Sequence, residues 1–395
     1  MTAEPVSRVR RALVRGEPLA GAVSGADHVA AGELLHLDSA VRAEIRGAGP
    51  LQGLLDDPAV TDVLVNGGEG GVWVDRGTGL EPCHIEGLDA AAVRGLATRL
   101  AAASGQRLDD ASPVVDGTLP DGTRLHAVLP PLSATGTLIS LRAHRPRAFT
   151  VEELVAGGTV PRPLAPVLRA MIDRRANVLV SGATGSGKTT LLAALLSLVP
   201  PTERIVCIEE SAELQPAHPH VVHLQVRRAN VQQVGGVPLA DLVRAAMRMR
   251  PDRLVLGECR GAEVRDVLGA LNTGHEGGWA TVHANTVTDV PARLVALGSL
   301  AGLTEATMTA QAVSALDAVV HLRRGRDGLR RLDEIGVLVR DGGQLRCDQA
   351  VVADATGPVP GPAWDRLAAR LEVDLAHAHA PATASGRRRG RHAGT

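Results

Sequence analysis

The residues from Gly182 to Thr190 carry the clearest chemistry in this 395-residue chain. In order they are Gly182, Ala183, Thr184, Gly185, Ser186, Gly187, Lys188, Thr189 and Thr190. The first eight fit the P-loop pattern G-x-x-x-x-G-K-[ST] without a gap. An apolar strand-like run precedes them and a helical pattern follows, so backbone N–H groups and a helix dipole would converge on phosphate oxygens. Lys188 would lie over the β and γ phosphates, and the Thr189 hydroxyl would hold Mg²⁺.

Acidic side chains follow two further apolar runs. Leu254–Leu256 is followed by Gly257 and Glu258, and Ile205–Ile208 is followed by Glu209 and Glu210. Ligands bind at the carboxyl ends of parallel strands, so Glu258 is expected to orient the attacking water and to contact the Mg²⁺ shell. Successive strand side chains face opposite sides, so only one of the adjacent pair can face that edge. Glu209 is the candidate we name for catalysis and metal binding, with Glu210 as the alternative.

A histidine ends a third run of this kind. His283 lies in ATVHAN, directly after the strand-like segment that begins at Trp279. At the same edge of the sheet its imidazole could sense the γ-phosphate. A single histidine is more often an ordinary surface or core residue, so its role depends on the other motifs.

The elements that would position these residues suggest several parts to the chain. The apolar positions of residues 1–50 have helical spacing, and 51–147 alternates short β-rich runs with one helix, as in an α+β domain. Residues 148–353 alternate helices and strands, which is typical of a mostly parallel sheet with helices on both faces. Residues 354–395 read as a linker over 355–362, a short amphipathic helix and a basic tail. A hinge is expected at 145–149.

Composition excludes several classes of function. The net charge is −1 and only four side chains are aromatic, so base stacking on single-stranded nucleic acid is not expected. The four cysteines form no C-x-x-C pair, which leaves no sign of a zinc ribbon or a disulfide framework. With no apolar leader and no run of eighteen apolar residues, the chain is expected to be cytoplasmic and not membrane-spanning.

Taken together, the motifs resemble the type II/IV secretion system ATPases, and within them the TadA and CpaF-like branch. GATGSGKTT is similar to the family's Walker A, RIVCIEESAEL to its acidic box, MRMRPDRLVLGECRGAE to its Walker B and NTGHEGGWATVHANT to its histidine box. GPLQGLLDDPAVTDVLVNG and SPVVDGTLPDGTRLHAVLPPL are similar to the family's N-terminal domain. The chain departs at Glu210, where the family usually has Asp. It also lacks the four-cysteine zinc module of many relatives, which favours the TadA-like branch.

The resemblance implies a RecA-like P-loop domain, a homo-hexameric ring and ATP bound between two domains. It also implies a place at the inner face of the cell membrane, beside the platform proteins of a pilus or secretion apparatus. Two arginines of the first domain would reach the phosphates, and the matching positions are Arg124 and Arg142. Their guanidinium groups would neutralise charge on the transferred phosphoryl group.

Two hypotheses follow. The first is an ATPase motor that powers assembly of a Tad/Flp-type pilus, protein secretion or conjugal transfer. The second is a ring that binds ATP but turns it over too slowly to be a motor. Direct DNA translocation is a third reading, disfavoured by the charge and the scarcity of aromatic residues.

Overall fold

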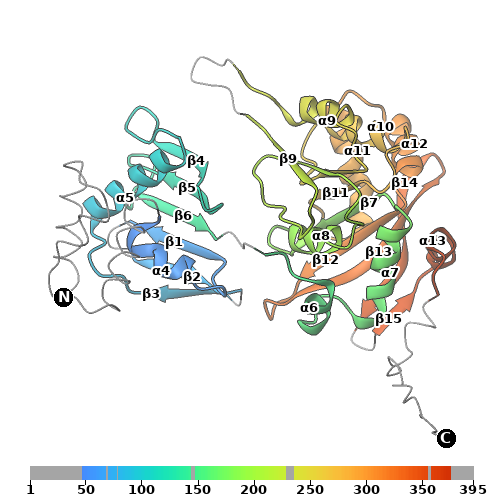
Figure 1. Ribbon diagram of the computed structural model, residues 1–395, viewed down its shortest axis with the longest axis horizontal. Coiled ribbons are helices and arrows are strands. Elements are labelled where there is room, and N and C mark those ends of the chain that lie inside the picture. Colours follow the sequence, from blue (N-terminus) through green and yellow to red (C-terminus); the bar gives the residue numbers. More distant parts are fainter. Residues whose placement is uncertain are drawn as a thin grey trace, which may run out of the picture. The chain divides into compact units, whose positions relative to one another are not determined.

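The chain folds into two compact units, Met1–Pro146 and Arg147–Thr395. The structure is a computed structural model that describes residues 47–67, 70–77, 79–143, 147–227, 235–354 and 357–374 (Figure 1). Most of the helical segment expected over 1–50 and the basic tail lie outside the described residues. In the described part, no helix is both long and apolar enough to cross a bilayer.

The first unit is built on a six-stranded antiparallel sheet in the order β3-β2-β1-β6-β5-β4. Its elements are η1 (Gly49–Leu51), α4 (Gln52–Leu55), β1 (Asp62–Asn66), β2 (Val72–Asp75), β3 (Leu80–Cys83), α5 (Ala90–Ala103), β4 (Val114–Thr118), β5 (Arg124–Val128) and β6 (Leu138–Arg142).

Helix α5 covers one face of this sheet. Asp89 caps it by accepting a hydrogen bond from the Ala92 N–H at 2.8 Å, which satisfies one of the free donors of the first turn. The helix buries Val93, Leu96 and Leu100 against the alternate strand residues that point to its side. The other face of β5 and β6 carries Arg124 and Arg142.

The second unit contains a nine-stranded sheet in the order β15-β14-β13-β12-β7-β11-β10-β8-β9. The six strands from β12 to β9 run parallel, and β13, β14 and β15 add antiparallel pairs at one side. The parallel strands are β7 (Val178–Gly182), β8 (Ile205–Glu209), β9 (Val221–Gln225), β10 (Arg253–Leu256), β11 (Trp279–Val282) and β12 (Ala318–Arg324). The others are β13 (Arg330–Asp341), β14 (Gln344–Asp354) and β15 (Gly357–Pro360).

Helices cover both faces of this sheet (Figure 1). Val178 and Val180 of β7 pack with α6, α7, α8 and α13, whereas Leu179 packs with α9, α10, α11 and α12. The helices are α6 (Val151–Ala156), η2 (Arg162–Leu164), α7 (Ala165–Asp173), α8 (Lys188–Leu196), α9 (Leu239–Met247), α10 (Val264–Leu271), η3 (Val287–Asp289), α11 (Val290–Leu300), α12 (Glu305–Ala315) and α13 (Trp364–Leu371). With buried alternate residues on both sides, the central strands have the near-continuous apolar character of a doubly covered parallel sheet.

The structure corrects the expected linker after residue 353. Instead of a linker over 355–362, strand β15 pairs with β14 from Val351–Pro360 to Asp354–Gly357. Trp364, Leu367 and Leu371 of α13 then pack into the same apolar core as β7 and α8. Prolines and glycines led the sequence reading to a linker, but an edge strand accepts proline because one of its sides needs no N–H donor.

Candidate active site

The P-loop lies where β7 meets α8. Every residue of β7 is buried, and α8 begins at Lys188. Gly185 and Gly187 have φ angles of 72° and 94°, which is the left-handed region that favours glycine. A Cβ at Gly182 would lie 2.3 Å from the backbone oxygen of Leu322 on the neighbouring strand β12, so a larger residue would collide there. The loop therefore needs glycine both for its turns and for its close packing on β12.

Lys188 is almost fully buried, with 7% of its surface exposed. Its Nζ donates to the backbone oxygens of Gly182 and Ala183 at 2.8 and 2.9 Å and lies 3.3 Å from Nδ1 of His283. These contacts hold the ammonium group over the loop, where it can exchange carbonyl oxygens for phosphate oxygens. Thr189 is partly buried on the first turn of α8, while Ala183, Thr184 and Thr190 are exposed.

Glu258 and His283 meet at the carboxyl ends of β10 and β11, which are adjacent and parallel. Nε2 of His283 lies 2.7 Å from Oε1 of Glu258. Because Lys188 contacts the other ring nitrogen, three of the predicted site residues form one continuous chain. Parallel strands bring their carboxyl ends to one edge, so Glu258 and His283 come together beside Lys188, which precedes His283 by 95 positions.

Electrostatic interactions set the protonation states of Glu258 and His283. Burial alone would raise the pKa of Glu258, but the hydrogen bond from Arg260 and the charges of His283, Arg260 and Lys188 bring that pKa below its ordinary value. Burial and the Lys188 charge lower the pKa of His283, against the opposing effects of Glu258 and of the Gly182 backbone. At neutral pH the imidazole is therefore uncharged. Its Nδ1 can then accept from the Lys188 ammonium group, which leaves the ring proton on Nε2, the nitrogen that faces Glu258.

Arg260 is a member of this network that sequence reasoning missed. Its Nε and Nη2 lie 2.8 Å from the two oxygens of Glu258, and its Nη1 donates to Oε2 of Glu210 at 3.0 Å. A guanidinium fork matches the geometry of a carboxylate and keeps it ionised. Its position two residues after Glu258 was the only available signal, because the link to Glu210 spans 50 residues.

The side chains of Glu209 and Glu210 point in different directions, as the alternation of side chains along a strand requires. Glu209 is 4% exposed, and its Oε1 accepts hydrogen bonds from the backbone N–H groups of Glu213 and Leu214, both at 2.9 Å. Its other oxygen lies 3.7 Å from Nδ1 of His223. Glu209 thus secures the acidic loop, whereas Glu210 reaches the Glu258 network through Arg260.

Arg330 is a second residue that sequence reasoning missed. From the start of β13 its Nε donates to the backbone oxygen of Gly185 at 3.0 Å. Its aliphatic stem lies 3.3 Å from the position that a Cβ on Gly187 would take. No local pattern marks Arg330, because the contact joins residues 145 positions apart.

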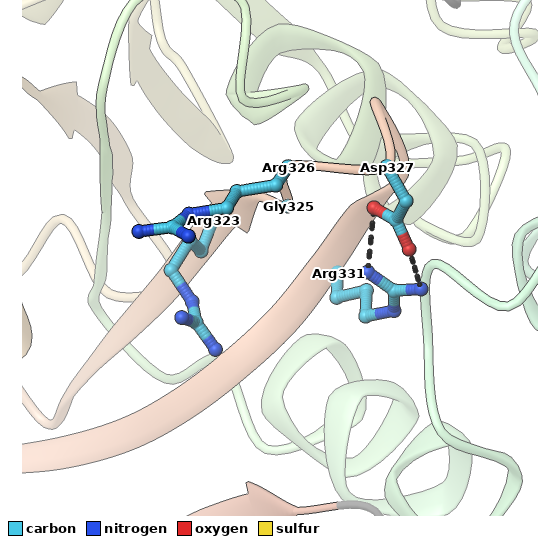
Figure 2. A pocket seen from close by; sticks show the side chains of 5 residues that line it. All are labelled: Arg323, Gly325, Arg326, Asp327 and Arg331. Atoms are coloured by element: carbon cyan, nitrogen blue, oxygen red, sulfur yellow. Dashed lines mark hydrogen bonds and ion pairs between the residues drawn. The ribbon is translucent and has the colours of Figure 1, made fainter.

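The hairpin tip between β12 and β13 is strongly basic. Arg323, Gly325, Arg326, Asp327 and Arg331 line a hollow there (Figure 2). Asp327 forms a two-pronged ion pair with Arg331 at 3.1 and 2.6 Å, and Figure 2 shows Arg323 and Arg326 extending away from that pair. Arg323 instead pairs with Asp333 at 2.8 Å.

Arg124 and Arg142 are neighbours within the first unit. They are directly opposed on β5 and β6, and Nε of Arg142 lies 3.5 Å from Oδ1 of Asp62 on β1. Opposed residues point to the same face of a sheet, so both arginines lie on the face that α5 leaves open. Their contact with nucleotide stays a prediction.

The P-loop environment fits a magnesium-bound nucleotide. Among the described residues, the buried Ser186 Oγ has no hydrogen-bond partner, and no cluster of three His, Cys, Asp or Glu side chains could hold a metal by itself. Mg²⁺ at nucleotide sites commonly takes one or two protein oxygens and completes its shell with phosphates and water. The Thr189 hydroxyl fits that smaller role, whereas the Glu209 carboxylate already accepts two backbone hydrogen bonds.

Comparison with known proteins agrees with this fold and these motifs. The family described as type II/IV secretion system protein matches residues 44–352. A Mycobacterium tuberculosis protein named as a conjugal transfer protein is 51% identical over 78% of this chain and 88% of its own length. The conjugal transfer protein TrbB of Rhizobium radiobacter is 32% identical over 71% of this chain and 84% of its own length.

Two solved structures bear on the fold alone. The ATPase DotB of Legionella pneumophila has a TM-score of 0.50 and 18% identity over 83% of this chain and 84% of its own. The pilus retraction motor PilT, solved with ADP, has a TM-score of 0.50 and 20% identity over 82% of this chain and 85% of its own. Both support the predicted RecA-like P-loop domain. The chain therefore belongs to the type II/IV secretion system protein family.

Proposed function

We propose that this protein is an ATPase motor of the TadA and CpaF-like branch, powering a Tad/Flp-type pilus, a secretion system or a conjugal-transfer apparatus. The observation that supports ATP hydrolysis is the series of contacts from Lys188 through His283 to Glu258, to which Arg260 also binds. It joins a phosphate-binding group to an ionised carboxylate within one network. The branch and pathway rest on the motifs and on the names of the relatives.

Each residue has a distinct part in the proposed mechanism. Lys188 leaves the Gly182 and Ala183 oxygens and neutralises charge on the β and γ phosphates, assisted by the N–H groups of the P-loop. The Thr189 hydroxyl would hold Mg²⁺, which supplies further charge neutralisation when bound. Glu258 orients the attacking water and accepts its proton, while Arg260 keeps the carboxylate ionised beforehand.

His283 gives this network its sensitivity to the ligand. In the described structure its Nδ1 accepts from Lys188. When Lys188 turns to the γ-phosphate, that nitrogen loses its donor and the Glu258–His283 pair can rearrange. His283 is therefore the residue whose contacts at the sheet edge are expected to change when the γ-phosphate is bound.

A phosphate-release assay tests hydrolysis directly. Wild type, Lys188→Ala and Glu258→Gln would be compared at saturating ATP and at a protein concentration high enough for assembly. Loss of a preorganised electrostatic group costs about 10²- to 10³-fold in turnover, so both variants should be near background. Binding of a fluorescent ADP analogue should weaken in Lys188→Ala and persist in Glu258→Gln.

The competing scaffold hypothesis predicts a different outcome. A nucleotide-gated ring with little turnover would give equal, low phosphate release in all three proteins while still binding ATP. That result would sink the motor proposal. Assembly can be followed in the same samples by light scattering with and without nucleotide.

Arg142 and Arg124 are proposed to reach the nucleotide from the first unit, in a homo-hexamer that docks on membrane platform proteins. We do not expect direct binding of nucleic acid. Arg142→Ala should lower turnover by about tenfold, the loss of one charge-assisted hydrogen bond, while ATP binding stays measurable. Asp62→Asn is the matched control, because it removes the ion-pair partner and keeps the arginine. Unchanged turnover in Arg142→Ala would remove Arg142 from the mechanism.

A further inference from the structure

His321 is a buried histidine on β12 that no motif identified. It is 2% exposed and lies opposite Ser181 in the parallel pairing of β12 with β7. Its Nδ1 lies 2.9 Å from Oγ of Ser181, which is itself fully buried. Ser181 is the residue directly before Gly182, so this contact reaches the start of the P-loop.

The same imidazole contacts the segment that follows His283. A hydrogen bond to the backbone of Asn285 raises the pKa of His321, although burial has the larger, opposite effect and lowers the pKa overall. One neutral ring thus links the strand entering the P-loop to the loop two residues beyond His283.

The neighbouring strand holds the next part of that loop. Glu334 on β13 is the register partner of His321, and its Oε1 accepts a hydrogen bond from Nε2 of Gln349 at 3.1 Å. Val287 is fully buried and packs on the same strand, because a Cβ at Gly336 of β13 would lie 2.8 Å from its Cγ2. The His321 side chain and the packing of Val287 on β13 therefore hold the loop at 285 and 287. Leucine or phenylalanine could fill the space of His321 but could make neither polar contact.

The proposed active site depends on the short distances from His283 to Lys188 and Glu258, and His283 directly precedes this loop. His283 must stay within 3.3 Å of Lys188 and 2.7 Å of Glu258 for the network described above. A displacement of about 1 Å is enough to lower catalysis by about 10²-fold in enzymes. Fixing the loop against β7 also means that a shift of the P-loop strand passes directly to His283.

We propose that His321 is a positioning residue that acts through His283, by holding the 284–287 loop against the strand that enters the P-loop. The inference rests on the proposed ATPase function. A core histidine that only fills space would affect stability, whereas a positioning histidine affects turnover and does so only when His283 is present.

A double-mutant cycle tests this coupling in the full-length protein. His321→Leu should lower kcat by about tenfold, equivalent to about 1.4 kcal/mol, with KM for ATP changed by less than about twofold. His321→Gln keeps a donor and an acceptor and should recover most of the turnover. His321→Leu should cause no further loss in the residual turnover of a His283→Ala protein, measured at high protein concentration.

Control measurements separate the possible failures. Thermal melting and binding of a fluorescent ADP analogue establish that each variant is folded, and Ser181→Ala offers a milder change, expected to lower kcat in the same direction. If wild type shows no hydrolysis, the proposed function fails. If wild type is active and His321→Leu keeps its kcat, or loses the same factor with and without His283, the positioning role is overturned.

Discussion

The two edges of the parallel sheet in the second unit use the same kinds of charge in different ways. At the amino edge, the side chain of Arg253 is 1% exposed. It donates to Oε2 of Glu203 at 2.6 Å and to the Ile172 backbone oxygen at 3.0 Å. At the carboxyl edge, Arg260 has a half-exposed side chain and bridges Glu258 and Glu210. Each arginine joins segments that are distant in sequence.

The difference lies in what each arginine can do after folding. A buried guanidinium has lost its water and depends on fixed partners, so the amino edge serves to join α7 to the loop before β8. A half-exposed arginine exchanges partners at little cost because water can replace them. The carboxyl edge can therefore rearrange around a ligand, whereas the amino edge cannot.

The largest expected effect concerns stability at the amino edge. Arg253→Met should destabilise the second unit by about 3–5 kcal/mol, because it breaks a buried ion pair and leaves Glu203 and the Ile172 carbonyl less well satisfied. Urea unfolding can be followed through the fluorescence of Trp279, which is buried on the adjacent region of β11.

Arg346→Met is the matched control for this change. Its side chain is 60% exposed and pairs with Asp341, so its loss should cost about 1 kcal/mol or less. Equal urea-unfolding midpoints for the two variants would contradict the proposed difference between the buried and the exposed arginine.

An intermediate effect is expected at the carboxyl edge. Arg260→Ala should reduce ATP turnover by about tenfold at neutral pH, since the two-pronged contact of its guanidinium group with Glu258 is lost. Glu258 is active as a carboxylate, so turnover falls as pH drops through its pKa. Arg260 lowers that pKa, and its removal should therefore move the acid limb of the pH–rate profile to higher pH.

The pH–rate profile of Arg265→Ala provides the comparison, because Arg265 is exposed on α10. Its profile should match that of wild type. Superimposable acid limbs for Arg260→Ala and wild type would contradict the assigned role of Arg260.

The smallest expected effect belongs to Glu210. Glu210→Gln should change turnover by about twofold, because its ion pair with Arg260 is solvent-exposed and worth about 1 kcal/mol or less. Glu210→Asp, which restores the family's usual residue, should be nearly silent. Glu209→Gln should instead lower thermal stability, since its carboxylate anchors two backbone N–H groups. A larger kinetic loss from Glu210→Gln than from Arg260→Ala would reverse this ranking.

Most elements of the fold could be predicted because their signals are local. The strand-like segment that was expected to begin at Trp279 is β11, which begins at that residue. Strand β3 carries a weaker local signal, because Pro82 and its exposed residues resemble a turn, although an edge strand can contain a proline. β15 was predicted as part of a linker because its glycine and prolines are typical of one, whereas its pairing with β14 makes it an edge strand.

The amino-acid sequence alone determined the P-loop, because its glycine turns, its lysine and its helix start are consecutive residues governed by local backbone sterics. It also indicated that Glu258 and His283 share a sheet edge, since parallel strands place their carboxyl ends together. Only the tertiary structure decided the partners that complete the network. Arg260 with Glu210, Arg330 with Gly185, and His321 with Ser181 are 50, 145 and 140 positions apart. Strand order and register create these contacts, and no local pattern encodes them.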